Sequence, residues 1–259
     1  MDVIFGACAG YPARKIRPFV VSLRRWYSGE VVLVSAHLPP DAKNLLNAYQ
    51  INEVEIELDQ PCSYIKFQRY FAYREILRAR PDISRAVLVD VRDVFFQGDP
   101  FLLLSEGSLV AFLEDETIGN CVFNTQSLET IYGHERTVEL ASHTISCSGT
   151  TGGTRAGLLH YLDLMCREIT AAAPKQMLSG DQGIHNHLLY SELPEAVLVP
   201  NRTGAVQTLH HQKEFTFDSS GQLLNIDRRI CPVVHQVDRY SRLFPLWRNL
   251  QEDGEFDLG

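Results

Sequence analysis

The sequence predicts an α/β domain with a mainly parallel central sheet, flanking helices and an irregular C-terminal part. Short runs of Val, Ile, Leu and Phe alternate with longer helical patterns over residues 1–115, which is typical of a helix-covered parallel sheet. These runs are continuously apolar, as expected for strands buried on both faces. Because no repeat or low-complexity linker divides the 259 residues, a single domain is the simplest interpretation.

Five apolar runs in the first half are expected to be strands. Each run is short, rich in β-branched residues and followed by a glycine, a proline pair or acidic residues that end it. The expected strands are 3–5, 31–34, 54–58, 86–89 and 109–113, with shorter candidates at 196–199 and 231–234.

Helices are expected between these strands. The candidates are residues 16–27, 64–80, a segment that begins after Thr154, and 182–190. Within 64–80 large apolar residues recur at steps of three and four, and Pro81 ends the pattern. The clearest stripe follows Thr154, a suitable N-cap residue, and consists of Leu158, Leu162, Met165 and Ile169.

Composition excludes several classes of protein. Lys and Arg total 24 and Asp and Glu 32, a net charge of −8, which argues against general binding to nucleic acids or anionic membranes but allows a local basic pocket for a phosphorylated ligand. No apolar run reaches the roughly 18–20 residues that span a bilayer, and the N-terminus lacks the basic region of a signal peptide. The six cysteines include no Cys-x-x-Cys pair, so reduced, mostly buried thiols in the cytoplasm are expected.

Acidic residues follow two of the expected strands, at the sheet edge where α/β proteins bind ligands. Asp90 and Asp93 follow the fourth strand, and Glu114 and Asp115 follow the fifth. Carboxylates at a strand end can hold Mn²⁺ or Mg²⁺, and such a cation could stabilise a departing diphosphate. The alternative is that these acids merely cap a helix or form a turn.

The segment 85–101 resembles the acid motif of GT-A-type glycosyltransferases, in which an apolar strand delivers Asp-x-Asp to the diphosphate of a nucleotide sugar. Later elements follow in an order similar to a group of bacterial and viral-type sugar transferases: Asn124, the small-residue run 147–153, Ser179-Gly180-Asp181-Gln182, and His235-Gln236-Val237-Asp238-Arg239. The resemblance implies one GT-A-like (Rossmann-like) domain over residues 1–259, with a nucleotide-binding half (1–115) and an acceptor-side half (116–259).

The motif departs from the family pattern, since it reads Asp90-Val91-Arg92-Asp93. Side chains alternate along a strand, so the two acids face one site only if the chain turns between them. Asp93 then binds the cation and Asp90 the donor or the same metal, with His235 as a third ligand implied by the resemblance. Alternatively Arg92 itself neutralises the diphosphate, and His235 is a structural histidine.

The resemblance also implies further donor contacts. The loop after the first strand contains Gly6, Ala7 and Tyr11 and would lie near the base and ribose. Arg69 on the 64–80 helix is expected near the donor, and Arg239 near a phosphate. The run 147–153 is expected to be a loop whose glycines allow close approach of a sugar or acceptor. Each of these features also has a purely structural interpretation, as a turn, a solvated face or a connecting loop.

Asp181 and Gln182 are the candidates for direct catalysis. In retaining enzymes of the family an acid here lies beneath the sugar, and in inverting enzymes an acid in this region is a general base. The Asp-Gln pair resembles the retaining families more closely. Asp181 could also be the N-cap of the 182–190 helix.

These features predict a glycosyltransferase that moves a hexosyl unit from a nucleoside diphosphate sugar to a hydroxyl of a glycan, lipid or protein, with Mn²⁺ or Mg²⁺ as cofactor. The expected partners are the nucleotide-sugar donor and a glycan or lipid-linked acceptor. The expected location is the cytoplasm, either free or at the inner face of a membrane. The alternatives are a metal-dependent phosphoester or nucleotide hydrolase and a non-catalytic nucleotide-sugar binding protein.

Overall fold

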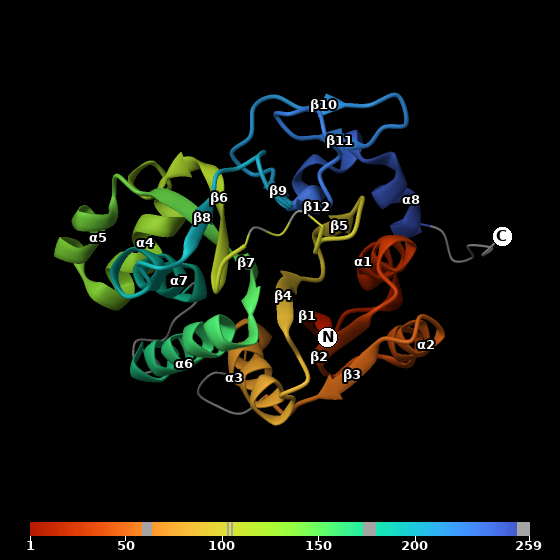
Figure 1. Cartoon of the computed structure of the whole chain (residues 1–259), viewed down its shortest axis with the longest axis horizontal. Coiled ribbons are helices and arrows are strands. Elements are labelled where there is room, and N and C mark those ends of the chain that lie inside the picture. Colours follow the sequence, from red (N-terminus) through yellow and green to blue (C-terminus); the bar gives the residue numbers. More distant parts are fainter. Residues whose placement is uncertain (59–63, 103, 105, 173–179, 253–259) are drawn as a thin grey trace.

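A seven-stranded sheet forms the centre of the computed structural model, which describes residues 1–58, 64–102, 104, 106–172 and 180–252. The strand order is β3-β2-β1-β4-β7-β6-β8 (Figure 1). The expected strands of the first half are all present, although the third is shorter than predicted. Their bounds are β1 (Asp2–Ala9), β2 (Glu30–Ala36), β3 (Asn52–Glu55), β4 (Arg85–Asp90), β6 (Leu109–Thr117), β7 (Thr144–Thr154) and β8 (Val197–Val199).

The sheet is mainly parallel, as the sequence predicts. β2 pairs in parallel with β1 and β3, β1 pairs with β4, and β6 pairs with β8. Only β7 among these strands runs antiparallel, to both β4 and β6. The strands β2 and β3 lie on one side of β1 and β4 lies on the other. Such a reversal of strand order opens a crevice at the carboxyl ends of the strands, where α/β sheets bind ligands.

Helices cover both faces of the sheet (Figure 1). On one face lie α1 (Ala13–Trp26) and α2 (Pro40–Ala48), and on the other lie α3 (Ile65–Ala79), α6 (Arg155–Ala172) and α7 (Gly180–Ser191). Further helices are α4 (Val122–Tyr132), α5 (His134–Leu140), α8 (Pro245–Glu252) and two 3-10 helices, η1 (Ile118–Asn120) and η3 (Val237–Leu243).

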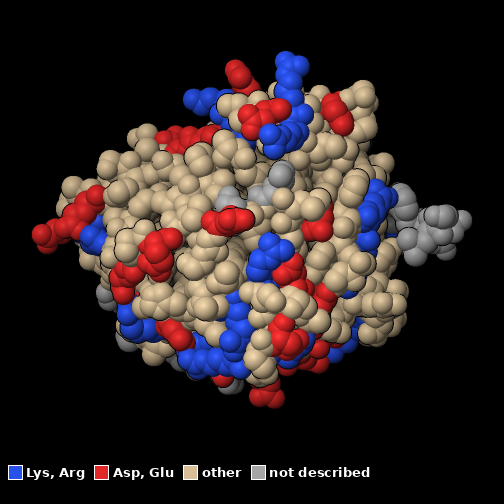
Figure 2. Space-filling model, in the orientation of Figure 1, with Lys and Arg blue, Asp and Glu red and all other residues tan. Residues whose placement is uncertain are grey.

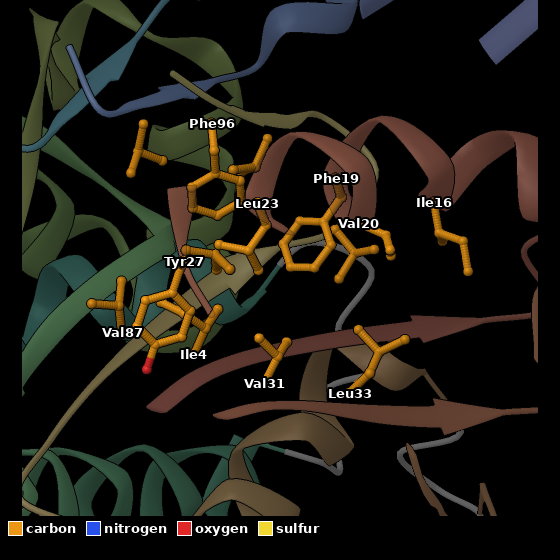
Figure 3. Packing of buried hydrophobic residues seen from close by; sticks show 14 of the residues in the cluster. Ile4, Ile16, Phe19, Val20, Leu23, Tyr27, Val31, Leu33, Val87 and Phe96 are labelled. Carbon is orange, nitrogen blue, oxygen red and sulfur yellow. The ribbon is translucent and has the colours of Figure 1, made fainter. Parts of the chain in front are cut away.

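Two hydrophobic cores, one on each face, account for the continuous apolar strands. Alternate residues of β1 enter different cores: Ile4 packs under α1, whereas Val3 and Phe5 pack under α3 and α6. Figure 3 shows Phe19 and Leu23 of α1 lying over the strands of the first core. A strand buried on both faces cannot alternate with polar residues, which is why the period-two pattern is missing from the sequence.

A second, three-stranded sheet lies beside the main one, next to the carboxyl end of β4. Its order is β5-β12-β9, formed by β5 (Val94–Phe96), β12 (Val233–His235) and β9 (Val206–Thr208). β5 is antiparallel to β12, and β12 is parallel to β9. A short hairpin of β10 (Thr216–Phe217) and β11 (Leu223–Leu224) follows in the chain.

The predicted loop at 147–153 is wrong, because these residues form the middle of β7, the central antiparallel strand. Glycine, serine and threonine are common in loops, but here small side chains let neighbouring elements approach closely. A Cβ on Gly152 would lie 2.7 Å from Leu104, and one on Gly153 would lie 2.3 Å from the Ser108 carbonyl oxygen.

The two residues predicted as helix N-caps, Thr154 and Asp181, have different outcomes. Thr154 does cap α6, since its Oγ1 accepts a hydrogen bond from the Gly157 N–H at 3.2 Å. Asp181 is not the residue before α7 but lies within its first turn. Ser179 of the same motif lies outside the described residues.

The cysteines that the structure describes are all buried and unbridged, which confirms the prediction of buried thiols for these five: Cys8, Cys121, Cys147, Cys166 and Cys231. Cys62 lies outside the described residues. Among the described helices, none has both the length and the hydropathy required to cross a bilayer.

Candidate functional site

A cavity of about 500 Å³ lies at the carboxyl ends of β1 and β4, at the reversal of strand order. It is bounded by the main sheet, by α3 and α7, and by the end of β12 with the start of η3. Of the residues predicted for donor, metal or catalysis, those that line it are Ala7, Tyr11, Arg69, Asp90, Arg92, Asp93, Asp181, Gln182, His235 and Arg239.

Gly6 is the predicted donor contact that does not line this cavity. Successive residues of β1 point to opposite faces, so Ala7 faces the cavity edge while Gly6 faces the core. A Cβ on Gly6 would lie 2.7 Å from Val91 Cγ2. This glycine therefore makes room for the chain that leaves β4, and its predicted contact with a nucleotide stays a prediction.

Strand register brings the two acids of the motif to one place. Asp90 ends β4 opposite Ala7 of β1. The chain then bends, burying Val91 in the core under α1, and Asp93 precedes β5 directly. The turn between the two acids, which a shared site requires, is therefore present.

His235 reaches the same place through the second sheet. β5 pairs with β12 so that Val94 lies opposite His235. His235 Nε2 lies 3.6 Å from Asp90 Oδ2 and 3.8 Å from Asp93 Oδ1. One ligand atom from each of the three side chains lies within 4.8 Å of the other two.

The three side chains fit a metal ion on two independent grounds. His235 is buried, and neither of its ring nitrogens has a hydrogen-bond partner among the described residues, although buried polar atoms are normally paired. A Cβ on Gly149 would lie 2.5 Å from Asp90 Oδ2 and 2.8 Å from His235 Nε2. Glycine at 149 thus leaves open the space between ligand atoms that a cation requires.

The electrostatics of the two acids differ. Burial alone would raise the pKa of Asp90, but Arg69 and His235 hold it well below its usual range. Burial raises the pKa of Asp93, against the opposing effect of His235. Burial disfavours a charged His235, yet the acidic groups around it, Cys147 and Asp90 first, raise its pKa well above the ordinary value. A bound cation would instead favour ionised carboxylates and a neutral imidazole, because these are the forms that bind metal.

Arg69 connects the metal candidates to Asp181. The guanidinium is buried and ion-paired with Asp90, and its Nη2 lies 3.2 Å from Asp181 Oδ2. The same nitrogen donates to the Ser148 carbonyl of β7 at 3.4 Å. Burial raises the pKa of Asp181, while Arg69 and Lys66 lower it. The guanidinium of Arg69 therefore lies between two carboxylates of the cavity, those of Asp90 and Asp181.

Gln182 has a positioning role in this arrangement. Its Oε1 accepts hydrogen bonds from the Ser148 N–H at 2.9 Å and from the Ser148 hydroxyl at 3.0 Å. Its Nε2 donates to the Ser146 carbonyl at 2.9 Å. The amide fastens α7 to β7, so Asp181 is the better placed of the two predicted catalytic residues for direct chemistry.

Two predicted arginines supply positive charge around the cavity. Arg92 is half-exposed, and its Nη2 lies 3.4 Å from Asp93 Oδ2 and 3.3 Å from Asp238 Oδ2. Arg239 lines the cavity from η3. With Lys66 on α3, these side chains could balance an anionic ligand larger than one carboxylate.

Three residues with no role predicted from the sequence also line the cavity: Lys66, Phe123 and Gln236. Cys147 and Ser148, from the run expected near a sugar or acceptor, line it as well, but from the strand β7 and not from a loop. Gln236 has a left-handed backbone with φ of 62°, which is uncommon outside glycine and gives no signal in a single sequence.

Glu114 is a further acid beside the site. It lies within β6, not at its end, and is buried, with its Oε2 3.5 Å from His211 Nε2. Burial raises its pKa to about 7.

The sequence matches no protein-family model, and a search of curated proteins found no match either. The function therefore has to be inferred from the side chains of the cavity.

Proposed function

We propose that this chain is a glycosyltransferase that moves a hexosyl unit from a nucleoside diphosphate sugar to a hydroxyl of a glycan, lipid or protein acceptor. The observation that carries the proposal is the convergence of Asp90, Asp93 and His235 in a cavity whose walls also bear Arg92 and Arg239. One cation site flanked by guanidinium groups suits a diphosphate, which needs its charge balanced as it leaves.

The order of residues across the cavity supports this donor. Ala7 and Tyr11 follow the crevice between β1 and β4, where a base and ribose would enter. Arg92 and Arg239 are available to the diphosphate, and Arg69 and Asp181 lie deeper, at the base of the cavity where the sugar would be. Apart from Asn124, which is buried in α4, the elements of the GT-A resemblance each contribute residues to one cavity although they lie far apart in the chain, as expected for a GT-A-like domain.

The donor set favours Mn²⁺ over Mg²⁺. Mg²⁺ takes oxygen ligands almost exclusively, whereas Mn²⁺ also accepts an imidazole nitrogen. Asp90, Asp93 and His235 would hold the ion, and when bound it would neutralise charge on the departing diphosphate. Arg92 would contribute a second positive charge. The metal and the arginine, which the unusual Asp-x-Arg-Asp order offers as alternatives, would then both balance the charge of the diphosphate.

Asp181 is proposed to act on the sugar, with retention of configuration. Its ion pair with Arg69 at 3.2 Å favours the carboxylate form in a buried place. Burial raises the pKa of Asp181 against the effect of Arg69, and in its ionised form the carboxylate would stabilise positive charge on an oxocarbenium-like sugar or contact sugar hydroxyls. We expect the enzyme to act in the cytoplasm, where the five cysteines that the structure describes would stay reduced.

The test is incubation with a panel of labelled nucleotide sugars, with and without Mn²⁺, after exhaustive chelation. We expect Mn²⁺-dependent transfer, or slow hydrolysis, of one donor. Asp93→Ala should reduce turnover at least 100-fold, since a metal supplies several kcal/mol of charge stabilisation, while Asp227→Asn, an exposed acid outside the cavity, should retain it.

Other results would replace the proposal. Release of phosphate from nucleotides that carry no sugar would identify a hydrolase. Donor binding without turnover, unaffected by Asp181→Asn, would identify a binding protein. Full activity after chelation would remove the metal and leave Arg92 as the charge that balances the diphosphate.

A further inference from the structure

An exposed apolar patch lies where the end of α1 meets the beginning of α8. Trp26, Leu243 and Leu246 are 47%, 40% and 39% exposed. Arg25, Arg242 and Arg248 are exposed beside them. These six residues are called the α1–α8 patch below.

The patch is built by an amphipathic helix. In α8 Trp247 and Leu250 are buried in a core with Phe95 and Phe244, while Leu246 and Arg248 point outward. A hollow of about 370 Å³ opens beneath, lined by Trp26, Leu246 and Phe95 among others. An apolar group that reaches the patch would therefore find depth as well as surface.

The charge of the patch is opposite to that of the chain. The whole sequence has a net charge of −8, yet the patch has three guanidinium groups, and the acid in contact with them among the described residues is Glu252, 4.0 Å from Arg248 Nε. Figure 2 shows basic side chains at the edge of the molecule where Figure 1 places α1 and α8. This local excess suits an anionic partner.

We propose that the α1–α8 patch docks this protein on an anionic membrane surface. Trp26, Leu243 and Leu246 would enter the interface, where tryptophan is favoured, and the arginines would pair with lipid phosphates. Apolar insertion and basic charge together make up the two signals that reversible membrane binding requires. A second copy of the chain is a poorer occupant, because a two-fold contact would bring the three arginines against their own copies.

The position of the patch gives docking a consequence for the cavity. The 3-10 helix η3 begins beside Arg239, which lines the cavity, and ends at Leu243 in the patch. Docking would hold the mouth of the cavity within one short helix of the lipid surface. This suits an acceptor that is itself anchored in a membrane.

The sequence contains two tryptophans, and both belong to this region, so intrinsic fluorescence reports on it directly. The full chain is mixed with vesicles of phosphatidylcholine alone or equimolar with phosphatidylglycerol, some of them brominated on the acyl chains. We expect binding to the anionic vesicles in a flotation assay, with quenching by bromolipid. Trp26→Phe should abolish most of the quenching, because the remaining Trp247 is buried in the protein.

Paired variants test the two parts of the surface. Leu243→Glu with Leu246→Glu should weaken vesicle binding more than tenfold, and Arg25→Gln and Arg242→Gln about fivefold each, from roughly 1 kcal/mol per basic residue at a lipid surface. Val138→Glu, at an apolar residue on α5 that is more exposed than either leucine, is the control and should bind normally. Circular dichroism checks that each variant is folded.

Equal binding to neutral and anionic vesicles, or equal loss with Val138→Glu, would overturn the proposal. So would a dimer in solution that Leu246→Glu dissociates, since a second copy would then cover the patch. The assay contains no nucleotide sugar, so its result is independent of the proposed glycosyl transfer.

Discussion

At the scale of single residues, a missing side chain determines whether the metal ligands can meet. Gly149 lies in β7 between Asp90 and His235, and a Cβ there would lie 2.5 Å from the carboxylate and 2.6 Å from the imidazole Cε1. Neither neighbour is the free end of a long flexible chain. The space that this glycine leaves is therefore part of the candidate metal site.

Gly149→Ala should weaken Mn²⁺ binding and turnover at least tenfold, because the new Cβ must displace the side chain of Asp90 or His235. Gly98→Ala is the matched control, because its Cβ would meet Pro232 at an ordinary 3.5 Å. Titration of Mn²⁺ followed by electron paramagnetic resonance measures the affinity. Unchanged affinity in Gly149→Ala would show that the ion, if bound, lies elsewhere.

Glu114 is a residue whose ionisation should affect the stability of the fold. Its folded pKa is raised to about 7 by burial, whereas in the unfolded chain it is about 4.5. Below the pKa of the unfolded chain, Glu114 is protonated in both the folded and the unfolded state, so its ionisation costs no stability. Between the two values the unfolded chain releases its proton first, so stability falls as the pH rises.

Glu114→Gln should remove this dependence. The variant and the parent protein should be similarly stable at pH 4.5, and by pH 8 the variant should be more stable by about 3 kcal/mol, from the difference between pKa values of about 7 and 4.5. Urea unfolding across this range measures the difference, with the exposed Glu195→Gln as control. A constant difference at every pH would contradict the raised pKa.

At the scale of elements, α3, α7 and β7 are joined through charges buried among them. Arg69 of α3 pairs with Asp90 at the end of β4 and with Asp181 of α7, while Gln182 fastens α7 to β7. Breaking such a network by removing one member leaves a buried charge uncompensated, which costs about 3–5 kcal/mol. The packing of the two helices is therefore coupled to the site.

Arg69→Met should destabilise the fold by about 3–5 kcal/mol, and adding Asp181→Asn should recover part of that loss. The recovery is expected because the second change removes one of the carboxylates that the first leaves unpaired. Denaturant unfolding of the two single variants and the double variant gives the coupling energy. Strictly additive losses would mean that the ion pair at 3.2 Å contributes nothing.

The elements also explain what the sequence could and could not predict. The carboxyl end of β4 was predictable, because an apolar run followed by Asp90 marks a strand end in a parallel sheet, whereas β1 continues past the expected end at Gly6 to Ala9. The sequence showed that a shared site requires a turn between Asp90 and Asp93, but the turn itself could not be derived from it. It depends on β5 and β12, three residues each and far apart in the chain, and strands so short carry little pattern.

The site residues that the sequence identified belong to an ordered set of motifs, whereas the others are brought to the cavity only by the packing of the elements. Asp181 and His235 belong to recognisable segments, whereas Lys66 and Ser148 line the cavity only because α3 and β7 meet there. β7 itself was hidden by its composition, since its small residues are selected by the close approach of Leu104 and Ser108. Composition indicates local preference, and here tertiary contacts override it.

At the scale of the whole molecule, the candidate metal site joins the two sheets. Asp90 comes from the main sheet and His235 from the smaller one, and Asp93 lies on the connection from β4 of the main sheet to β5 of the smaller one. An ion held by all three would connect both sheets in the folded state alone, because the unfolded chain does not bring these residues together. Metal binding should therefore appear as stability of the whole fold.

Saturating Mn²⁺ should raise the melting temperature of the chelated protein by roughly 5–10 °C. At 100 times its dissociation constant a ligand of the folded state contributes about 2.7 kcal/mol, and in a chain of this size 1 kcal/mol corresponds to about 2–4 °C. Asp93→Ala should lose the shift, and Asp227→Asn should keep it. Differential scanning calorimetry with and without chelator measures both. An equal rise in the two variants would mean that Mn²⁺ stabilises the protein through some other group, and the three ligands would then have to be assigned a purely structural role.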